Sequence, residues 1–214
     1  MDNNASETLV VLDFETSGMS PDQGDRAIEV GAVLLREGQI VDRFQSLMNP
    51  GFPVSGFIQE FTGISNSMLQ KSPDNASVMS EFFKFIGDFP LVAHNASFDR
   101  RFLAVELRQI GCQRTFEFAS SMLAARRIYQ DAPNHKLATL VAYKQLPVGG
   151  QFHRALADAE MTAHLWLRMI DDLREDYGFR QVPFELLQKL AKVAKKKVPQ
   201  FLEKQRVEQS RSER

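Results

Sequence analysis

The chain has 214 residues, of which 43% are hydrophobic and 25% are charged, and its formal net charge at pH 7 is −1. This composition is typical of a soluble globular protein with a sizeable core, organised as one domain with an appendage. A single cysteine, Cys112, excludes an intramolecular disulfide and a zinc site built from several cysteines. Residues 1–7 lack the apolar core of a signal peptide, and no apolar run approaches the ~20 residues of a membrane span, so we expect a cytoplasmic protein.

Apolar periodicity and turn residues predict alternating strands and helices. In chain order, we expect a strand at 9–15, strands at 27–35 and 40–48 around a hairpin turn, helices at 55–69 and 74–89, a strand at 91–93, a helix at 97–110, a strand at 116–118, and helices at 120–129, 136–144 and 154–176. A hairpin followed by alternating helices and strands favours an α/β fold with a mixed sheet covered by helices.

Residues 180–214 differ from the rest of the chain in charge. They contain ten Lys or Arg and four Asp or Glu, so they carry a net charge of +6 while residues 1–179 carry −7. An amphipathic helix is expected at 184–193, and the lysine-rich and polar remainder is typical of disorder. A basic tail on an acidic body is common in enzymes of nucleic acids and also in proteins whose tail is merely solvated.

Asp13 and Glu15 interrupt the first apolar strand. Side chains at positions i and i+2 of a strand point to the same side, so both carboxylates project together. Two buried like charges are costly unless a cation neutralises them, and Mg²⁺ or Mn²⁺ prefers such oxygen ligands. The alternative is a strand end at which both acids reach water.

Three more residues could join this pair, each with a simpler explanation. Asp158 lies on the apolar side of its helix, or else in a first turn that is open to solvent. Asp99 follows a helix start, where an acid also favours the helix dipole. His153 precedes Asp158 after the Gly149-Gly150 pair, and it could approach a site from a mobile helix entrance or be an ordinary surface histidine.

Three segments in order resemble the DEDD superfamily of exonucleases, in the branch that uses histidine. They read DFETSG at 13–18, HNASFD at 94–99 and HRALADA at 153–159, with supporting similarity at 27–33 and 61–64. This branch includes the proofreading epsilon subunit of bacterial DNA polymerase III, RNase T and oligoribonuclease. The resemblance covers about residues 8–170, and Ser17 stands where the family often has a second threonine.

The resemblance implies a ribonuclease H-like fold with a central mixed five-stranded sheet. It implies that Asp13, Glu15, Asp99 and Asp158 hold two divalent cations, Mg²⁺ or Mn²⁺, with His153 as general base. The expected reaction is 3′–5′ hydrolysis that releases nucleoside 5′-monophosphates from a nucleic acid end. The segment at 177–179 is expected to close the exonuclease domain, which spans 1–179, and the basic tail at 180–214 lies outside the resemblance.

Substrate contacts are expected within and beside the same motifs. The candidates are Phe14, Thr16, Thr62, Ile64, Asn95 and Phe98. The Phe14 ring should point away from Asp13 and also suits the core, Phe98 suits the core or a base contact, and Asn95 could instead cap its helix.

Several alternatives remain open at this stage. DNA is favoured as the substrate, and an RNA-trimming enzyme is the nearest rival. A catalytically silent module that binds nucleic acid or protein is a rival from another class. The basic tail could contact phosphates, or it could attach the chain to a polymerase or another protein partner.

Overall fold

The computed structural model describes residues 8–112, 115–148 and 153–212, so residues 1–7 and the Gly149-Gly150 pair lie outside the described residues. Its centre is a five-stranded sheet of β1 (Leu9–Thr16), β2 (Ala27–Arg36), β3 (Gln39–Leu47), β4 (Leu91–Ala93) and β5 (Phe118–Ser120), in the order β3-β2-β1-β4-β5. The first three strands are antiparallel, whereas β4 and β5 run parallel to β1. The predicted mixed five-stranded sheet is confirmed.

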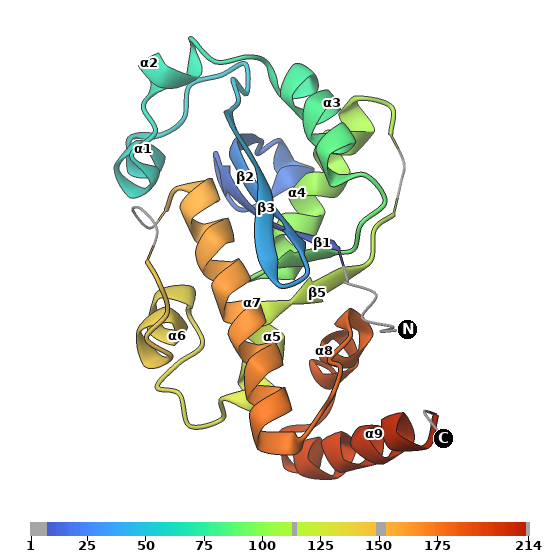
Figure 1. Ribbon diagram of the computed structural model, residues 1–214. Helices are drawn as coiled ribbons and strands as arrows, with labels where there is room; N and C mark the ends of the chain where they lie inside the picture. Colours follow the sequence, from blue (N-terminus) through green and yellow to red (C-terminus); the bar gives the residue numbers. More distant parts are fainter. Residues whose placement is uncertain (1–7, 113–114, 149–152, 213–214) are drawn as a thin grey trace.

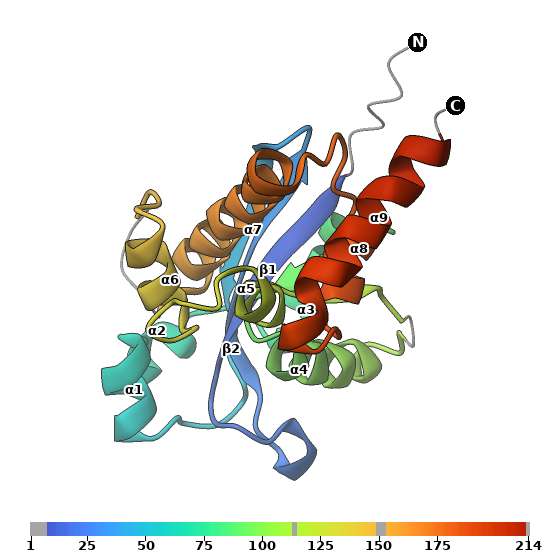
Figure 2. The same ribbon diagram turned by 90° about the horizontal axis from the view of Figure 1, so that it is seen from below.

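Helices cover both faces of this sheet (Figures 1 and 2). They are α1 (Gly56–Thr62), α2 (Asn66–Leu69), α3 (Asn75–Ile86), α4 (Ala96–Gln109), α5 (Ser121–Ile128), α6 (Leu137–Tyr143), α7 (Ala155–Tyr177), α8 (Phe184–Leu190) and α9 (Val198–Ser212), with short 3₁₀ turns η1 (Pro21–Gln23) and η2 (Lys195–Lys197). Helices α3 and α4 lie on one face, and α5, α7 and α8 lie on the other. No helix in the described part of the chain is both long and apolar enough to cross a membrane.

Side chains of β1 alternate between these two faces. Val10 and Leu12 pack in the core beneath α3 and α4, whereas Val11 packs in the core beneath α7. Because this alternation has a period of two, Asp13 and Glu15 lie on the α7 face, as expected from their spacing. The acids therefore share the face on which the longest described helix begins.

Helix α7 begins very close to β2, and a glycine makes this approach possible. A Cβ atom added to Gly31 would lie 2.1 Å from the backbone nitrogen of Leu156. Any larger residue would therefore push the first turn of α7 off the sheet. Since Gly31 is paired with Asp13 in the register of β1 and β2, this turn is placed beside the acids of β1.

Two predicted elements differ in their bounds. The helix expected at 55–69 is two helices, because Gly63 takes a left-handed φ of +71° and ends α1 with its N–H bonded to the Gln59 carbonyl. Ser65 then caps α2 by accepting from the Met68 N–H. Strand β5 lies two residues after the predicted 116–118, where Phe118 pairs with Leu91.

The disorder predicted for the end of the chain is wrong for α9, which extends to Ser212. Val198 and Leu202, one turn apart, are 2% and 1% exposed and join the core under α7. Pro199 lies in the first turn of α9, where a helix tolerates proline. Phe184 and Leu187 of α8 are buried in the same core, so part of the predicted tail extends the body of the protein.

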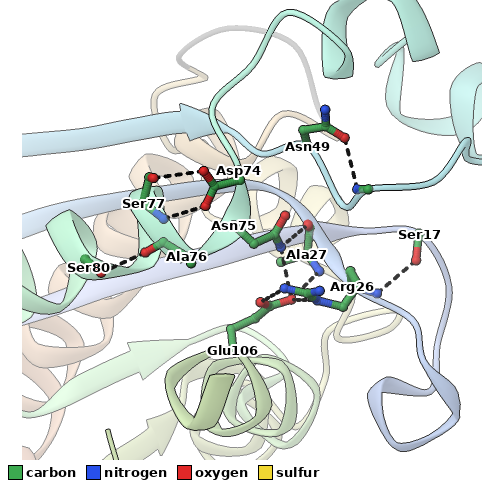
Figure 3. A network of polar contacts seen from close by, with 11 residues as sticks. Ser17, Arg26, Ala27, Asn49, Asp74, Asn75, Ala76, Ser77, Ser80 and Glu106 are labelled. Atoms are coloured by element: carbon green, nitrogen blue, oxygen red, sulfur yellow. Dashed lines mark hydrogen bonds and ion pairs between the residues drawn. The ribbon is translucent and has the colours of Figure 1, made fainter. Parts of the chain in front are cut away.

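A buried acid also ties β2 to α3 and α4, as Figure 3 shows. Glu106 of α4 is 1% exposed and accepts from Arg26 Nε at 2.9 Å and Nη2 at 2.8 Å. It also accepts from the Ala27 N–H at 3.0 Å and from Asn75 Nδ2 at 3.1 Å. The Arg26 N–H in turn donates to the Ser17 hydroxyl, which fixes the loop that leaves β1.

Candidate active site

The end of β1 and the start of α7 bring three predicted site residues together. Oxygen or nitrogen atoms of Glu15, His153 and Asp158 lie within 4.8 Å of one another, close enough to hold one metal ion. Asp158 is in the first turn of α7 and is 8% exposed, as is Glu15 at the end of β1. Both carboxylates are therefore buried, and the alternative that they are exposed to solvent at a strand end or in a first helical turn does not apply.

The start of α4 adds Asp99 to the same place. Asp99 is 2% exposed, and its Oδ1 accepts from the Phe14 N–H at 3.2 Å, between Asp13 and Glu15. The negative charge of Asp99 is the largest electrostatic contribution, after burial, to the raised pKa of Asp13. Four acids from β1, α4 and α7 therefore converge, as the motifs predict. They are Asp13, Glu15, Asp99 and Asp158, and together they are called the acid group.

Burial, and then repulsion from the neighbouring acids, raises the pKa of both acids of β1. Burial, followed by the charges of the other three acids and of Glu29, raises the pKa of Asp13 well above its ordinary value. Burial raises the pKa of Glu15 to about 8, with Asp158 the next contributor and Arg154 acting against it. These groups resist ionising together unless positive charge is supplied.

The pKa values of the two helix acids are also raised, mainly by burial. Burial raises the pKa of Asp99 to about 7, against hydrogen bonds from backbone N–H groups, including that of Phe14. Burial also raises the pKa of Asp158, against a hydrogen bond from the His153 N–H. Clustered carboxylate oxygens are the ligands that hard divalent cations prefer, so the donor set fits Mg²⁺ or Mn²⁺.

His153 lies at the entrance to α7 in an unusual backbone conformation, with a φ of +63°. Its N–H donates to Asp158 Oδ2 at 2.8 Å, and its exposed ring lies 4.2 Å from the ring of Phe61. His153 is therefore exposed, as an ordinary surface histidine would be. It also lies beside the four acids, as the motif predicts.

An aromatic surface that the sequence did not predict lies beside this histidine. Phe57 and Phe61 lie one turn apart on α1, are 71% and 50% exposed, and stack with ring centroids 5.9 Å apart. Large exposed apolar side chains that lie together often mark a binding surface. The available signal was the pair of phenylalanines at i and i+4 in a predicted helix that is otherwise largely polar.

Glu29, which was not predicted as a site residue, lies beneath the acid group. It pairs with Glu15 in the register of β1 and β2 and is 0% exposed. Arg154 Nη2 donates to it at 2.9 Å, so this fifth acid already has a cation from the chain. The other four acids have no such bonded partner among the described residues.

Two predicted substrate contacts are wrong as side-chain contacts, because the rings or branches lie in the core. Phe14 is 4% exposed and packs edge-on against Phe82, which confirms that it points away from Asp13. Ile64 is 0% exposed and packs with Ile28. Membership of a motif did not reveal which way these side chains face.

The remaining predicted contacts differ in their accessibility. The hydroxyl of Thr62 donates to the Ile58 carbonyl and accepts from the Ile64 N–H, and that of Thr16 donates to the Gly18 carbonyl. Asn95 is exposed and makes no capping bond through its side chain, although it occupies the cap position of α4. Phe98 is half-buried against Phe102.

His94 of the second motif has a structural setting. Its Nδ1 lies 2.8 Å from the Ser121 hydroxyl, and its Nε2 lies 3.0 Å from the His135 carbonyl oxygen. Burial lowers the pKa of His94 to about 4, so it stays neutral and links the end of β4 to the segments around α5.

Comparison with known proteins agrees with this geometry. The family model described as "RNase_T: Exonuclease" matches residues 10–166. A PolC-type DNA polymerase III of Bacillus cereus is 39% identical over 172 residues, which cover 80% of this chain and 12% of that protein. The 3′–5′ exonuclease DinG of Bacillus subtilis is 34% identical over 189 residues, which cover 88% of this chain and 20% of that protein.

Solved structures agree as well. A structure described as exonuclease X in complex with 5′-overhanging duplex DNA has a TM-score of 0.67 and 27% identity, over 86% of this chain and 99% of that chain. The nuclease domain of 3′hExo, a DEDDh family member bound to rAMP, has a TM-score of 0.68 at 20% identity, over 79% of this chain and 94% of that chain, and supports the fold. This chain spans between 12% and 20% of the length of the curated relatives named above. The chain therefore belongs to the RNase_T family of exonucleases.

Proposed function

We propose that this chain is a metal-dependent 3′–5′ exonuclease that removes nucleoside 5′-monophosphates from the end of a single-stranded or frayed DNA strand. The convergence of Asp13, Glu15, Asp99 and Asp158 beside His153 carries the proposal. DNA is preferred over RNA because the relatives include DNA polymerases, and because the exonuclease X structure contains duplex DNA.

The four acids would hold two divalent cations. Exonucleases of this family depend on divalent metal ions. The raised pKa values of these acids mean that the site favours added positive charge at neutral pH. When bound, such ions lower the pKa of a water molecule and stabilise negative charge on the departing 3′-oxygen.

His153 would accept the proton of the attacking water at a ring nitrogen. A proton acceptor for this step needs a pKa near neutrality, and histidine is the side chain that ordinarily has one. Its ring is exposed, so the proton can pass on to solvent, while its backbone is held by Asp158. Asp158 thus binds cations and also holds the base.

The aromatic surface of Phe57 and Phe61 would receive the bases at the strand end. Bases stack on aromatic rings with little dependence on sequence, which suits an enzyme that must remove every nucleotide in turn. Phe61 also contacts His153, so a stacked terminal base would lie directly beside the reacting phosphate. Thr16, Asn95 and Phe98 stay as predicted contacts.

The test is a side-by-side digestion of DNA and RNA strands of one sequence, labelled at the 5′ end. With Mg²⁺ we expect products shortened one nucleotide at a time from the 3′ end, with release of 5′-monophosphates, and faster hydrolysis of DNA. Excess chelator should stop the reaction. Full activity in chelator, or products that carry 3′-phosphates, would contradict the proposal, and faster RNA hydrolysis would favour the RNA-trimming alternative.

A polymerase or another protein could be a partner through the basic C-terminal part. Deletion of residues 180–214 is a poor test, because it removes Phe184 and Leu187 from the core. Replacing Lys195, Lys196 and Lys197 by glutamine is cleaner, because all three side chains are exposed. Loss of strand binding at low salt would favour phosphate contacts, and unchanged binding would favour a protein partner.

A further inference from the structure

The segment of β2 at 27–33 contributes none of the four acids. Two of its residues on the face covered by α7 nevertheless position the start of that helix. Two positions of this side, Glu29 and Gly31, lie beneath the start of α7. Gly31 leaves the space into which the backbone of Ala155 and Leu156 fits, and a Cβ atom there would overlap both. Together they form a seat for the helix entrance.

Glu29 holds that entrance through both of its oxygens. Arg154 donates to it from Nη2 at 2.9 Å and from Nε at 3.2 Å, and the Ala155 N–H donates at 3.1 Å. Gln45 of β3 donates to the same carboxylate at 2.9 Å. A bidentate arginine–carboxylate pair together with a backbone hydrogen bond fixes both the orientation and the distance of the helix start, which a single hydrogen bond does not.

We propose that Glu29 and Arg154 are positioning residues, whose ion pair fixes the entrance of α7 and so holds His153 beside Asp158 and Glu15. The inference rests on the proposed function, since it assigns His153 the role of base. It follows from the chain itself: His153 directly precedes the clamped residue, has a positive φ, and is otherwise held by its N–H bond to Asp158 and its ring contact with Phe61.

The placement of Glu29 supports a geometric role. Its negative charge adds to the repulsion that raises the pKa of Asp13 and Glu15, so it makes the acid group harder to ionise. A buried negative charge beside other acids costs free energy, so its presence calls for a compensating structural role. The clamp on Arg154 and Ala155 is that role.

The experiment compares Glu29→Gln with Asp172→Asn, a matched control. Asp172 is a buried acid on α7 that pairs with Lys144 and Arg168 far along the helix from His153. Both variants remove one buried charge from an ion pair. Hydrolysis of a nitrophenyl ester of thymidine 5′-monophosphate is measured for each single variant and for each variant combined with His153→Ala. Amide hydrogen exchange is measured in the metal-free protein.

We expect Glu29→Gln to lower kcat by about 10–100-fold, as loss of a supporting bond to a site residue often does, with KM unchanged. In the His153→Ala background it should cost under about threefold, because a residue that acts through the base has no further effect once the base is gone. Arg154→Lys should retain more activity than Arg154→Met. Asp172→Asn should leave kcat unchanged in both backgrounds.

Equal losses of kcat in Glu29→Gln and Asp172→Asn, or the same loss from Glu29→Gln with and without His153, would overturn the proposal. Hydrogen exchange separates this from failure of the proposed function. If the wild-type protein hydrolyses no nucleotide ester, the clamp is still supported by faster exchange of the His153 and Ala155 amides in Glu29→Gln than in Asp172→Asn. Unchanged exchange at these amides overturns it.

Discussion

Two aspartates of α7 are buried to a similar extent, but their pKa values shift in opposite directions. Asp158 in the first turn is 8% exposed, and Asp172 near the end is 4% exposed. Burial raises the pKa of Asp158 above its ordinary value. Burial also acts to raise the pKa of Asp172, but hydrogen bonds from Lys144, Tyr129 and Arg168 together hold it below its ordinary value.

The difference lies in the partners. Lys144 Nζ is 2.8 Å and the Tyr129 hydroxyl 2.6 Å from Asp172 Oδ2, and Arg168 pairs with its other oxygen. Asp158 instead has acids nearby, among them Glu15. A buried acid with cationic partners in the chain is part of the scaffold, whereas buried acids gathered together indicate a site for an external cation.

The largest expected effect is the loss of hydrolysis in Asp158→Ala, measured with a labelled DNA strand and Mg²⁺. Removing Asp158 should not lower the melting temperature of the metal-free protein, because burial disfavours the charged form of this acid. Asp172→Ala should do the reverse, with activity kept and stability lost. Activity in Asp158→Ala near the wild-type level would break the comparison.

His153→Ala should slow hydrolysis by about 10²–10⁴-fold, the usual worth of a general base. The fold should be unaffected, because the His153 ring is exposed. Circular dichroism at matched concentrations checks the fold, and single-turnover rates check the chemistry. A loss below tenfold would mean that another group accepts the proton.

Asp172→Ala should destabilise the protein by about 2–4 kcal/mol, since it leaves Lys144 and Arg168 without their shared partner and the buried Tyr129 hydroxyl unbonded. Partial exposure of the two cations keeps the figure below that of a fully buried pair. Denaturant unfolding in chelator measures it. Unchanged stability would show that the Asp172 network contributes nothing to the scaffold.

His94 extends the comparison to a buried base, with a smaller effect. Its pKa is lowered to about 4 from its ordinary 6.5, so the unfolded chain binds the proton more tightly. Its contribution to stability is therefore complete above pH 6.5 and declines as the pH falls toward 4, by at most about 3 kcal/mol. The difference in unfolding free energy between wild type and His94→Asn should shrink over this range, and a constant difference would contradict the lowered pKa.

Much of the site could be predicted because its chemistry is local in the sequence. Asp13 and Glu15 share a side of a strand by spacing alone, and the ordered motifs added Asp99, Asp158 and His153. Glu29 could not be found in this way, because its partner Arg154 lies 125 positions away. A single chain gives no sign of such long-range pairing.

Other differences also arise from tertiary packing. Helix α9 is polar overall, so composition alone indicated disorder. The buried side chains of Val198 and Leu202 tie the helix to the core. The break at Gly63 depends on a left-handed backbone that the continuous helical pattern concealed. Phe14 and Ile64 lie within motif segments but face the core, which is decided by the neighbouring elements.

Diffraction from a crystal soaked in Mn²⁺ and a nucleoside 5′-monophosphate tests the central claim most directly. The account predicts two anomalous peaks bounded by Asp13, Glu15, Asp99 and Asp158, with none at Asp172. Peaks elsewhere on the molecule, or none among these acids at saturating Mn²⁺, would contradict it.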